Sequence, residues 1–283
     1  MAKTHDLKRR IRSIKNTMQV TKAMKMVSSA RLRRAQERIL AARPSAIATR
    51  RVLSSLAARA NPELHPLLVQ RPIHRVEIVL ITSDRGLCGS FNANILKAGV
   101  QFIAERPRGE TSVLTIGRRG RDAARRRKVR ITSEWIDVFR NLEFATASTI
   151  ADDLIARYTN EEIDAVFIAY NEFKNIATQR PVIEQVLPIP RESLEGPAQD
   201  YIYEPDPATL LEAFLPAYVR IEIWRALLES AAAEHAARMT AMDSATKNAK
   251  ELTDALTLHM NRVRQASITT EIIEVVSGAE ALG

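Results

Sequence analysis

The chain has 283 residues, of which 46% are hydrophobic and 5% aromatic, enough to bury one ordinary core with extended structure beside it. Its single cysteine, Cys88, excludes an intramolecular disulfide framework and suits a reducing compartment. The sequence has no run of ~18–20 apolar residues, as a membrane span requires, and no apolar stretch near its basic N-terminus that could act as a secretory signal. We therefore expect a soluble protein that is not exported.

The formal charge of +9 is concentrated at one end of the chain. Residues 1–43 hold thirteen Lys and Arg residues against only Asp6 and Glu37, so the rest of the chain has a small net negative charge. Such a block favours an acidic surface: nucleic acid, anionic lipid or a carboxylate-rich protein. The block has no aromatic residue to stack on bases, and its cations surround the expected helix instead of leaving a broad apolar face. A carboxylate-lined protein surface fits it best.

Both ends of the chain lack the two strongest helix breakers. The first 43 residues contain neither proline nor glycine and predict one long helix. All twelve prolines lie between Pro44 and Pro216, and Ala217–Ser277 predicts a second helix. At 1.5 Å per residue this second helix would span on the order of 90 Å, so we expect it to protrude from its own domain.

The segment between these ends predicts an α/β domain. Arg75–Thr82 reads as a β-branched strand that ends at the turn sequence SDRGLCGS, and a helix follows over Asn92–Glu105. The other expected elements are strands at Thr111–Ile116, Ile163–Tyr170 and Pro181–Leu187 and helices at Gly120–Lys128 and Ala147–Tyr158. This alternation predicts a mainly parallel, Rossmann-like sheet, and the five prolines of 188–207 predict a linker after it.

Residues in the last stretch follow alternating steps of three and four, which is the pattern of a coiled-coil seam. This seam comprises Ile221, Trp224, Leu228, Ala231, His235, Arg238, Met242, Ala245, Ala249, Leu252, Leu256, His259, Val263 and Ala266. The N-terminal seam comprises Leu7, Ile11, Ile14 and Met18, continued loosely by Thr21, Met24 and Val27. We predict that the two helices pair antiparallel in one coiled coil, the alternative being two amphipathic helices in a larger bundle. Several seam residues are alanines, which suits a helix pair enclosed by a surrounding partner and equally suits close approach of the two helices without a partner.

No pattern in the sequence predicts an active site. The loop Ser83–Ser90 lies between a strand and a helix like a phosphate cradle, but it lacks both the GxGxxG spacing and the GK[ST] end of a P-loop. We assign it no nucleotide, although Arg85 could bind an anion. Cys88 fits a small buried filler better than a nucleophile, and interhelical hydrogen bonds would explain His235 and His259. We predict no catalytic residue, no cofactor-binding residue and no metal site.

Four segments together carry a specific likeness. They are RIRSIKNTMQVTKAMKMVSSARLRRAQ at Arg10–Gln36, SDRGLCGSFN at Ser83–Asn92, YEPDP at Tyr203–Pro207 and RQASITTEIIEVVSGAEAL at Arg264–Leu282. In these segments, and over essentially the whole chain, the sequence resembles the gamma subunit family of F-type ATP synthases. The polar residues of the last segment make it the most specific of the four, since a generic coiled coil has no reason to hold them in that order.

The resemblance implies a long antiparallel coiled coil of N- and C-terminal helices plus a central α/β (Rossmann-like) domain. The expected division is an N-terminal shaft helix at 1–60, the α/β domain at 73–190, a proline-rich foot loop at 191–209 and a C-terminal shaft helix at 210–283. The implied function is the central rotor shaft of a proton-translocating ATP synthase, which couples hydrogen ion transport to ATP synthesis or hydrolysis. The chain itself would be noncatalytic and bind no cofactor, because ATP, ADP and magnesium are bound by partner subunits.

The same resemblance implies partners and contacts. One copy per complex would stand inside three catalytic and three noncatalytic nucleotide-binding subunits and meet an epsilon-type subunit and the membrane rotor ring, with no nucleic acid bound. Met24 and Lys25 would lie at a collar facing an acidic segment of the catalytic subunits. Arg264 and Gln265 would touch a catch loop of a catalytic subunit. The foot-loop residues that would lie near the membrane ring and the epsilon-type subunit are Tyr203, Glu204 and Asp206.

The resemblance also bears on location and regulation. The gamma-like helix begins within a few residues of Met1, so we expect a peripheral membrane protein on the cytoplasmic face of a bacterial inner membrane; a mature chain at the mitochondrial inner membrane, matrix side, is the alternative. The cysteine-bearing insertion of the plant-plastid members is absent, so no thiol switch is expected. The alternative function is a basic coiled-coil adaptor that binds an acidic protein assembly or nucleic acid without nucleotide-binding subunits.

Overall fold

The structure is a computed structural model that describes residues 2–57, 65–107, 110–190, 204 and 206–280. The chain divides into two compact units. The first, here called the helix-pair unit, consists of Met1–Ser28 and Met239–Gly283, and the second, here called the sheet unit, is Ser29–Arg238. Two long helices, α1 (Ala2–Ala57) and α5 (Pro207–Glu280), contribute residues to both units.

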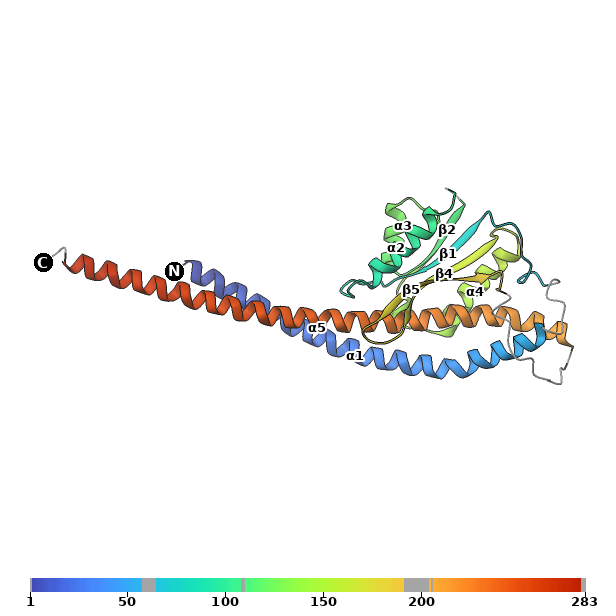
Figure 1. Cartoon of the computed structure of the whole chain (residues 1–283), viewed down its shortest axis with the longest axis horizontal. Helices are drawn as coiled ribbons and strands as arrows, with labels where there is room; N and C mark the ends of the chain where they lie inside the picture. The colour runs from blue at the N-terminus through green and yellow to red at the C-terminus, as the bar shows by residue number, and fades with distance from the viewer. Residues whose placement is uncertain (1, 58–64, 108–109, 191–203, 205, 281–283) are drawn as a thin grey trace. The chain divides into compact units, whose positions relative to one another are not determined.

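The sheet unit is built on five strands. They are β1 (Val76–Ile81), β2 (Thr111–Ile116), β3 (Ile131–Trp135), β4 (Ala165–Phe173) and β5 (Gln179–Leu187). Their order in the sheet is β3-β2-β1-β4-β5, with β5 antiparallel to β4 and all other pairs parallel (Figure 1). The order β3-β2-β1-β4 is that of Rossmann-type sheets, which confirms the expected mainly parallel α/β domain.

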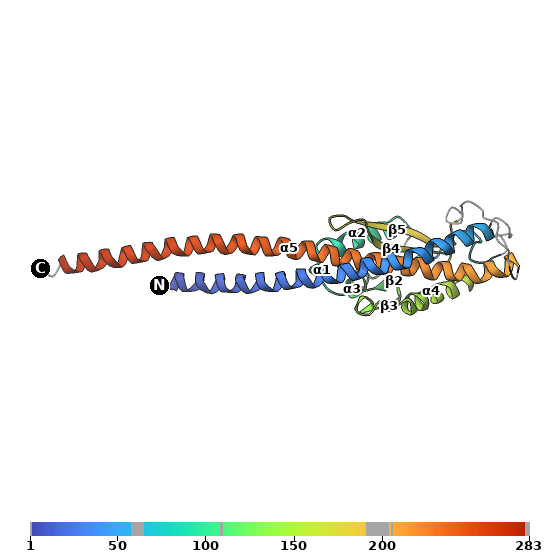
Figure 2. The ribbon, with the colours of Figure 1, turned by 90° about the horizontal axis from the view of Figure 1, so that it is seen from below.

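Helices cover both faces of this sheet. Helices α2 (Phe91–Ala104) and α3 (Arg118–Arg126) lie on one face, and α4 (Phe144–Thr159) lies on the other (Figures 1 and 2). Successive strand residues point to opposite faces, so Ile78 packs towards α2 while Val79 packs towards α4. β1 is therefore apolar at nearly every position, as a strand buried on both faces must be.

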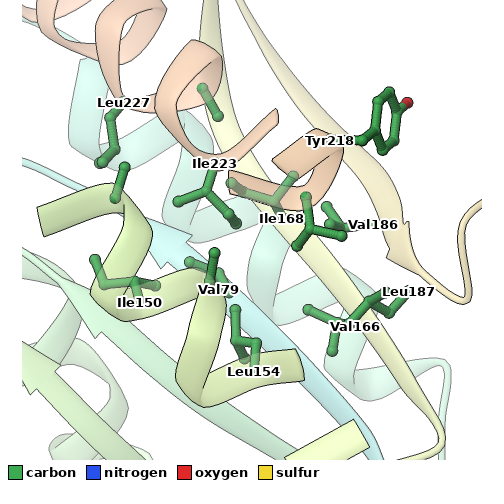
Figure 3. Packing of buried hydrophobic residues seen from close by; sticks show 14 of the residues in the cluster. Val79, Ile150, Leu154, Val166, Ile168, Val186, Leu187, Tyr218, Ile223 and Leu227 are labelled. Atoms are coloured by element: carbon green, nitrogen blue, oxygen red, sulfur yellow. The ribbon is translucent and has the colours of Figure 1, made fainter. Parts of the chain in front are cut away.

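The larger core lies between the sheet, α4 and the part of α5 that belongs to the sheet unit. Figure 3 shows Val79 and Ile168 from the sheet facing Leu154 of α4 and Ile223 of α5, and each of these side chains is at most 1% exposed. Burial of each such side chain stabilises the fold by ~1.5–3 kcal/mol. Leu53 and Leu56 at the end of α1 are completely buried in the same cluster. The sheet unit thus has a complete core of its own.

In the helix-pair unit, the segments of α1 and α5 lie side by side and antiparallel, and both views agree on this (Figures 1 and 2). The hydroxyls of Thr21 and Thr246 are 2.8 Å apart, and Lys25 Nζ donates to Asp243 Oδ1 at 2.6 Å. Since the lower number on α1 meets the higher number on α5, these two contacts fix the antiparallel register. The predicted pairing of the terminal helices is confirmed.

The details of the predicted seam are wrong at several positions. Val27 is 53% exposed while its neighbour Ser28 is buried, and Leu252 is 50% exposed while Thr253 is buried. His259 and Ala266 are also exposed. The buried face follows the helical steps regardless of polarity, because a seam hydroxyl can be satisfied within its own helix: Thr253 Oγ1 donates to the carbonyl of Ala249 at 2.8 Å.

The helix ends expected from the prolines, at residues 43 and 217, are wrong, because Pro44 and Pro216 lie inside α1 and α5; the shaft helices implied by the resemblance, 1–60 and 210–283, already contain both prolines. A proline inside a helix removes one backbone hydrogen bond and crowds the preceding turn. Here buried residues lie beyond each proline: Leu56 after Pro44, and Leu211 before Pro216. Packing of these residues into the core offsets the cost of the proline.

Strand β3 was not expected from the sequence. Its residues, ITSEW, are mostly polar, and most of them are half-buried at the edge of the sheet. An edge strand buries too little apolar surface to show a clear hydrophobic pattern. By contrast, β2 matches its predicted range residue for residue.

No helix among the described residues is long and apolar enough to cross a bilayer.

Candidate partner-contact sites

Lys25 is held by α5 in the helix-pair unit. Its Nζ lies 2.6 Å from Asp243 Oδ1, and Lys247 Nζ lies 3.0 Å from the other oxygen of the same carboxylate. The hydrogen bond from Lys25 is the main cause of a lowered pKa at Asp243. Lys25 and its neighbour Met24 are both half-buried. An acidic partner at this position would therefore meet a lysine that already has a carboxylate beside it.

Arg264 and Gln265 lie on α5 in the same unit, and both are exposed. They are separated from the Lys25–Asp243 pair by about 30 Å along the helix, given its rise of 1.5 Å per residue. Neither side chain makes a hydrogen bond or ion pair with another described residue. They are free to contact another protein, but they form no common site with Met24 and Lys25.

The foot-loop residues belong to the sheet unit. Tyr203 lies outside the described residues, and Glu204 is exposed. Asp206 begins α5: its Oδ1 accepts hydrogen bonds from the backbone N–H groups of Ala208 at 2.9 Å and Thr209 at 3.0 Å. A hydrogen bond from the Thr209 hydroxyl is the main cause of a lowered pKa at Asp206, and these backbone bonds lower it further. Asp206 is thus an N-cap residue, a structural role that the sequence reasoning did not assign.

The loop between β1 and α2 closes on itself. Asn92 Oδ1 accepts a hydrogen bond from Ser83 N at 3.0 Å, Ser83 Oγ donates to the Arg85 carbonyl at 2.6 Å, and Gly89 has a positive φ of 56°. Cys88 is 2% exposed, and burial raises the pKa of its thiol. The reading of Cys88 as a buried filler in a tight strand-to-helix connection is confirmed.

The two seam histidines do not make the expected interhelical hydrogen bonds. His235 Nδ1 is buried without a partner among the described residues, and burial lowers the pKa of His235 to about 4, helped by Arg238 and Arg31. His259 is exposed. Within the described ranges, no group of three or more His, Cys, Asp or Glu side chains is placed to hold a metal ion.

A strip of exposed aliphatic residues near the end of α5 was missed by the sequence reasoning. In the register set by Thr21 and Thr246, the first residue of α1, Ala2, lies opposite about residue 265, so the described part of α5 beyond it has no α1 residue beside it. The residues between 47% and 72% exposed there are Ile268, Ile272, Ile273, Val275 and Val276, here called the apical strip. Exposed aliphatic side chains gathered on one helix segment are typical of surfaces that another protein covers. The sequence could have indicated this strip, because its aliphatic residues lie beyond the part of the C-terminal helix that pairs with the N-terminal helix.

Comparison with known proteins relates the whole chain to one family. The family model described as ATP synthase matches residues 3–282. Among curated proteins, the chain is 52% identical over 280 residues to the ATP synthase gamma chain of Solibacter usitatus (strain Ellin6076), covering 98% of each chain. It is also 50% identical over 289 residues to the ATP synthase gamma chain of Anaeromyxobacter sp. (strain Fw109-5), covering all of both chains.

Solved structures agree on the fold. A chain from the central stalk and c-ring of Tetrahymena thermophila mitochondrial ATP synthase superposes with a TM-score of 0.62 at 26% identity, covering 80% of this chain and 99% of that one. A chain from Euglena gracilis mitochondrial ATP synthase gives a TM-score of 0.72 at 20% identity, covering 99% of this chain and 95% of that one. The likeness of sequence and fold thus extends over nearly the full length.

Proposed function

This chain belongs to the family of ATP synthase gamma chains, and on that premise we propose that it is the central rotor shaft of an F-type, proton-translocating ATP synthase. It couples rotation of the membrane ring to ATP synthesis or hydrolysis in a catalytic hexamer and makes or breaks no bond itself. One observation carries the proposal: about half of the residues of this chain are identical to those of ATP synthase gamma chains over essentially their whole length.

The proposed partners are three catalytic and three noncatalytic nucleotide-binding subunits, an epsilon-type subunit and the membrane rotor ring, with one shaft per complex. ATP, ADP and magnesium are bound by those partners. The similar solved chain at 26% identity supports this setting, since it comes from the central stalk and c-ring of a mitochondrial ATP synthase. The working division remains 1–60 and 210–283 as shaft helices, 73–190 as the α/β domain and 191–209 as the foot loop.

The apical strip gives the shaft a reason to be surrounded. Burying one exposed isoleucine is worth ~1.5–3 kcal/mol, so five aliphatic residues on an unpaired helix supply a strong drive to enter an apolar sleeve. A helix presents different residues to different sides, so a turning shaft contacts the three catalytic subunits unequally. Each catalytic site then changes state because its contacts with the shaft differ in the alternative conformations.

The individual contacts are proposals of the same kind. Met24 and Lys25 face an acidic segment of a catalytic subunit, and Arg264 and Gln265 touch a catch loop, consistent with the free, exposed position of the latter two. Near the membrane ring and epsilon-type subunit we place Tyr203, Glu204 and Asp206. The cap that Asp206 provides for α5 limits its freedom to bind a partner through the same oxygens.

We place the complex at the cytoplasmic face of a bacterial inner membrane, with the chain attached through its partners. The support is that the curated relatives at about 50% identity come from bacteria. The mitochondrial inner membrane, matrix side, is the alternative location, and membrane fractionation of the native host distinguishes the two.

The test of the proposed function is co-isolation of the tagged chain from its host, followed by native mass determination and an ATPase assay. We expect one copy of the chain per six nucleotide-binding subunits, with ATPase activity in the same fraction. A homo-oligomer or a nucleic-acid complex without ATPase activity would contradict the shaft function and favour the adaptor.

A further inference from the structure

The sheet unit contains an open cleft of about 510 Å³ with an unusual concentration of arginine side chains. The arginines that line it are Arg31, Arg34, Arg38, Arg85, Arg140 and Arg238. Three carboxylates also line it: Asp84, Asp137 and Glu234. All of these residues belong to the sheet unit, so the cleft lies within one compact body.

The three carboxylates already have cationic partners. Arg118, at the start of α3, donates to Asp137 Oδ2 at 2.9 Å and gives its backbone N–H to Asp84 Oδ1 at 3.1 Å. Arg238 Nη2 lies 2.7 Å from Glu234 Oε1. Arg118 is shared between Asp84 and Asp137, and Arg238 pairs with Glu234, so the other five arginines that line the cleft form no ion pair with a described residue.

Arg38, one of these five, donates to the carbonyl of Leu142 at 3.2 Å. The guanidinium groups of the other four make no hydrogen bond or ion pair with a described residue: Arg31, Arg34, Arg85 and Arg140. All four are exposed, so an anion can reach them from solvent. Like charges held around one cavity repel each other, and an anion bound between them relieves that repulsion. Arg31 and Arg34 lie one turn apart on α1, which puts both on the same side of that helix.

The position of the cleft in the fold is that of ligand sites in open α/β sheets. Asp84 and Arg85 follow the carboxyl end of β1, and Asp137 and Arg140 follow the carboxyl end of β3. Ligands of open α/β sheets bind outside the carboxyl ends of the strands, near the point where the strand order reverses. Here the order reverses between β1 and β4, so the cleft shares the β1 end of that point and extends from it towards β3.

We propose that this cleft binds a small multivalent oxyanion of the di- or triphosphate class. Its volume lies within the ~300–1,000 Å³ of ordinary small-ligand sites. The planar fork of arginine matches phosphate oxygens with two parallel hydrogen bonds. The carboxylates of an extended acidic peptide alternate between its two sides, whereas linked phosphates present contiguous charge that several converging guanidiniums can share.

The test is calorimetric titration of the full-length chain with inorganic tripolyphosphate at fixed ionic strength. The site variant Arg34→Ala/Arg140→Ala is compared with the control variant Arg10→Ala/Arg12→Ala, which removes the same charge from exposed positions outside the cleft. We expect one tripolyphosphate per chain for wild type and control, and binding at least about tenfold weaker in the site variant, since each lost charge-assisted hydrogen bond is substantial.

Three results would overturn the proposal. Equal weakening of tripolyphosphate binding in both variants would indicate general attraction to a basic chain. The absence of saturable binding would show that the cleft is not a site, and equal or tighter binding of a pentaglutamate peptide would indicate an acidic polypeptide as the occupant. Fluorescence of Trp135 and Trp224, which both belong to the sheet unit, verifies that the variants are folded.

Discussion

The two units of this chain are stabilised in different ways. The sheet unit buries complete apolar side chains from strands and helices in a large core, and its buried carboxylates Asp164 and Glu77 are paired with arginines. The helix-pair unit has a narrow seam with hydroxyl residues such as Thr21 and Ser28, and it leaves the apical strip exposed. One unit is complete by itself, whereas the other has the surface of a protein that needs a partner.

A core truncation should have the largest effect and should separate the two units. Leu154→Ala removes a fully buried side chain that contacts both sheet and α5, so we expect a loss of ~2–5 kcal/mol in the unfolding free energy. Leu252→Ala, on the half-exposed face of the helix pair, should cost within about 0.5 kcal/mol. Urea unfolding monitored by the two tryptophans, both in the sheet unit, measures the loss of unfolding free energy in Leu154→Ala. Similar losses in both variants would contradict the contrast between the units.

The pH dependence of the sheet unit should be the next largest effect. The unfolded chain protonates His235 near pH 6.5, whereas the folded chain does so only at about pH 4, because the ring is buried and lies near two arginines. The stability that neutral His235 provides is therefore complete above about pH 6.5 and is lost as pH falls towards 4. Its full size is about 3 kcal/mol, at 1.36 kcal/mol per pKa unit.

The comparison that isolates this effect is His235→Leu. Its unfolding free energy should fall less between pH 6.5 and pH 4 than that of the wild type, measured by the same tryptophan signal. An identical pH slope in the two proteins would show that His235 is not the group responsible.

Changes in the apical strip should leave the isolated chain almost unaffected. Ile272→Ser combined with Ile273→Ser replaces two exposed side chains, so the unfolding free energy of the free chain should change by no more than ~0.5 kcal/mol. Association with the catalytic hexamer should weaken at least about tenfold, because the partner no longer buries these side chains. Glu271→Gln combined with Glu274→Gln, at exposed neighbouring positions, is the matched control. A destabilised free chain would mean that the strip already has an intramolecular role.

The smallest effect on stability is expected at Lys25, whose pair with Asp243 is partly exposed and screened by solvent. Lys25→Glu should instead reduce proton pumping per ATP hydrolysed by the complex. The double variant Lys25→Glu/Asp243→Lys restores an internal ion pair with reversed charges. If it restores pumping, the internal pair is what matters; if only Lys25 itself supports pumping, its contact with an acidic partner is supported. Unchanged pumping in the single variant removes Lys25 from the contacts.

The sequence predicted the features that depend on local pattern. The apolar run of β1, the helix after the SDRGLCGS loop and the long terminal helices follow from periodicity and the absence of breakers. It could not predict β3, whose pairing depends on its neighbour β2 and not on its own polar residues. The local pattern also could not predict that Pro44 and Pro216 are tolerated, because the compensating packing is tertiary; only the resemblance, with shaft helices at 1–60 and 210–283, included both prolines.

Some features of the candidate contacts could likewise be predicted from the sequence, whereas others required the fold. Arg264 and Gln265 are exposed and lie where α5 runs beside the first residues of α1. The spacing of Arg31, Arg34 and Arg38 already put three cations on one helix face. The meeting of that face with the loops after β1 and β3 required the fold. The N-cap role of Asp206 was readable from its position just before Pro207, a residue favoured at the first position of a helix.

The central claim is that this chain turns inside a ring of nucleotide-binding subunits, and direct observation of rotation tests it best. Gln101→Cys places an exposed thiol on α2 for attachment of a bead, while the native Cys88 is buried and protected from labelling. With the hexamer fixed to a surface and ATP supplied, we expect the bead to turn continuously in one direction at a rate that rises with ATP concentration. ATP hydrolysis by the complex with only random motion of the bead would contradict the shaft function.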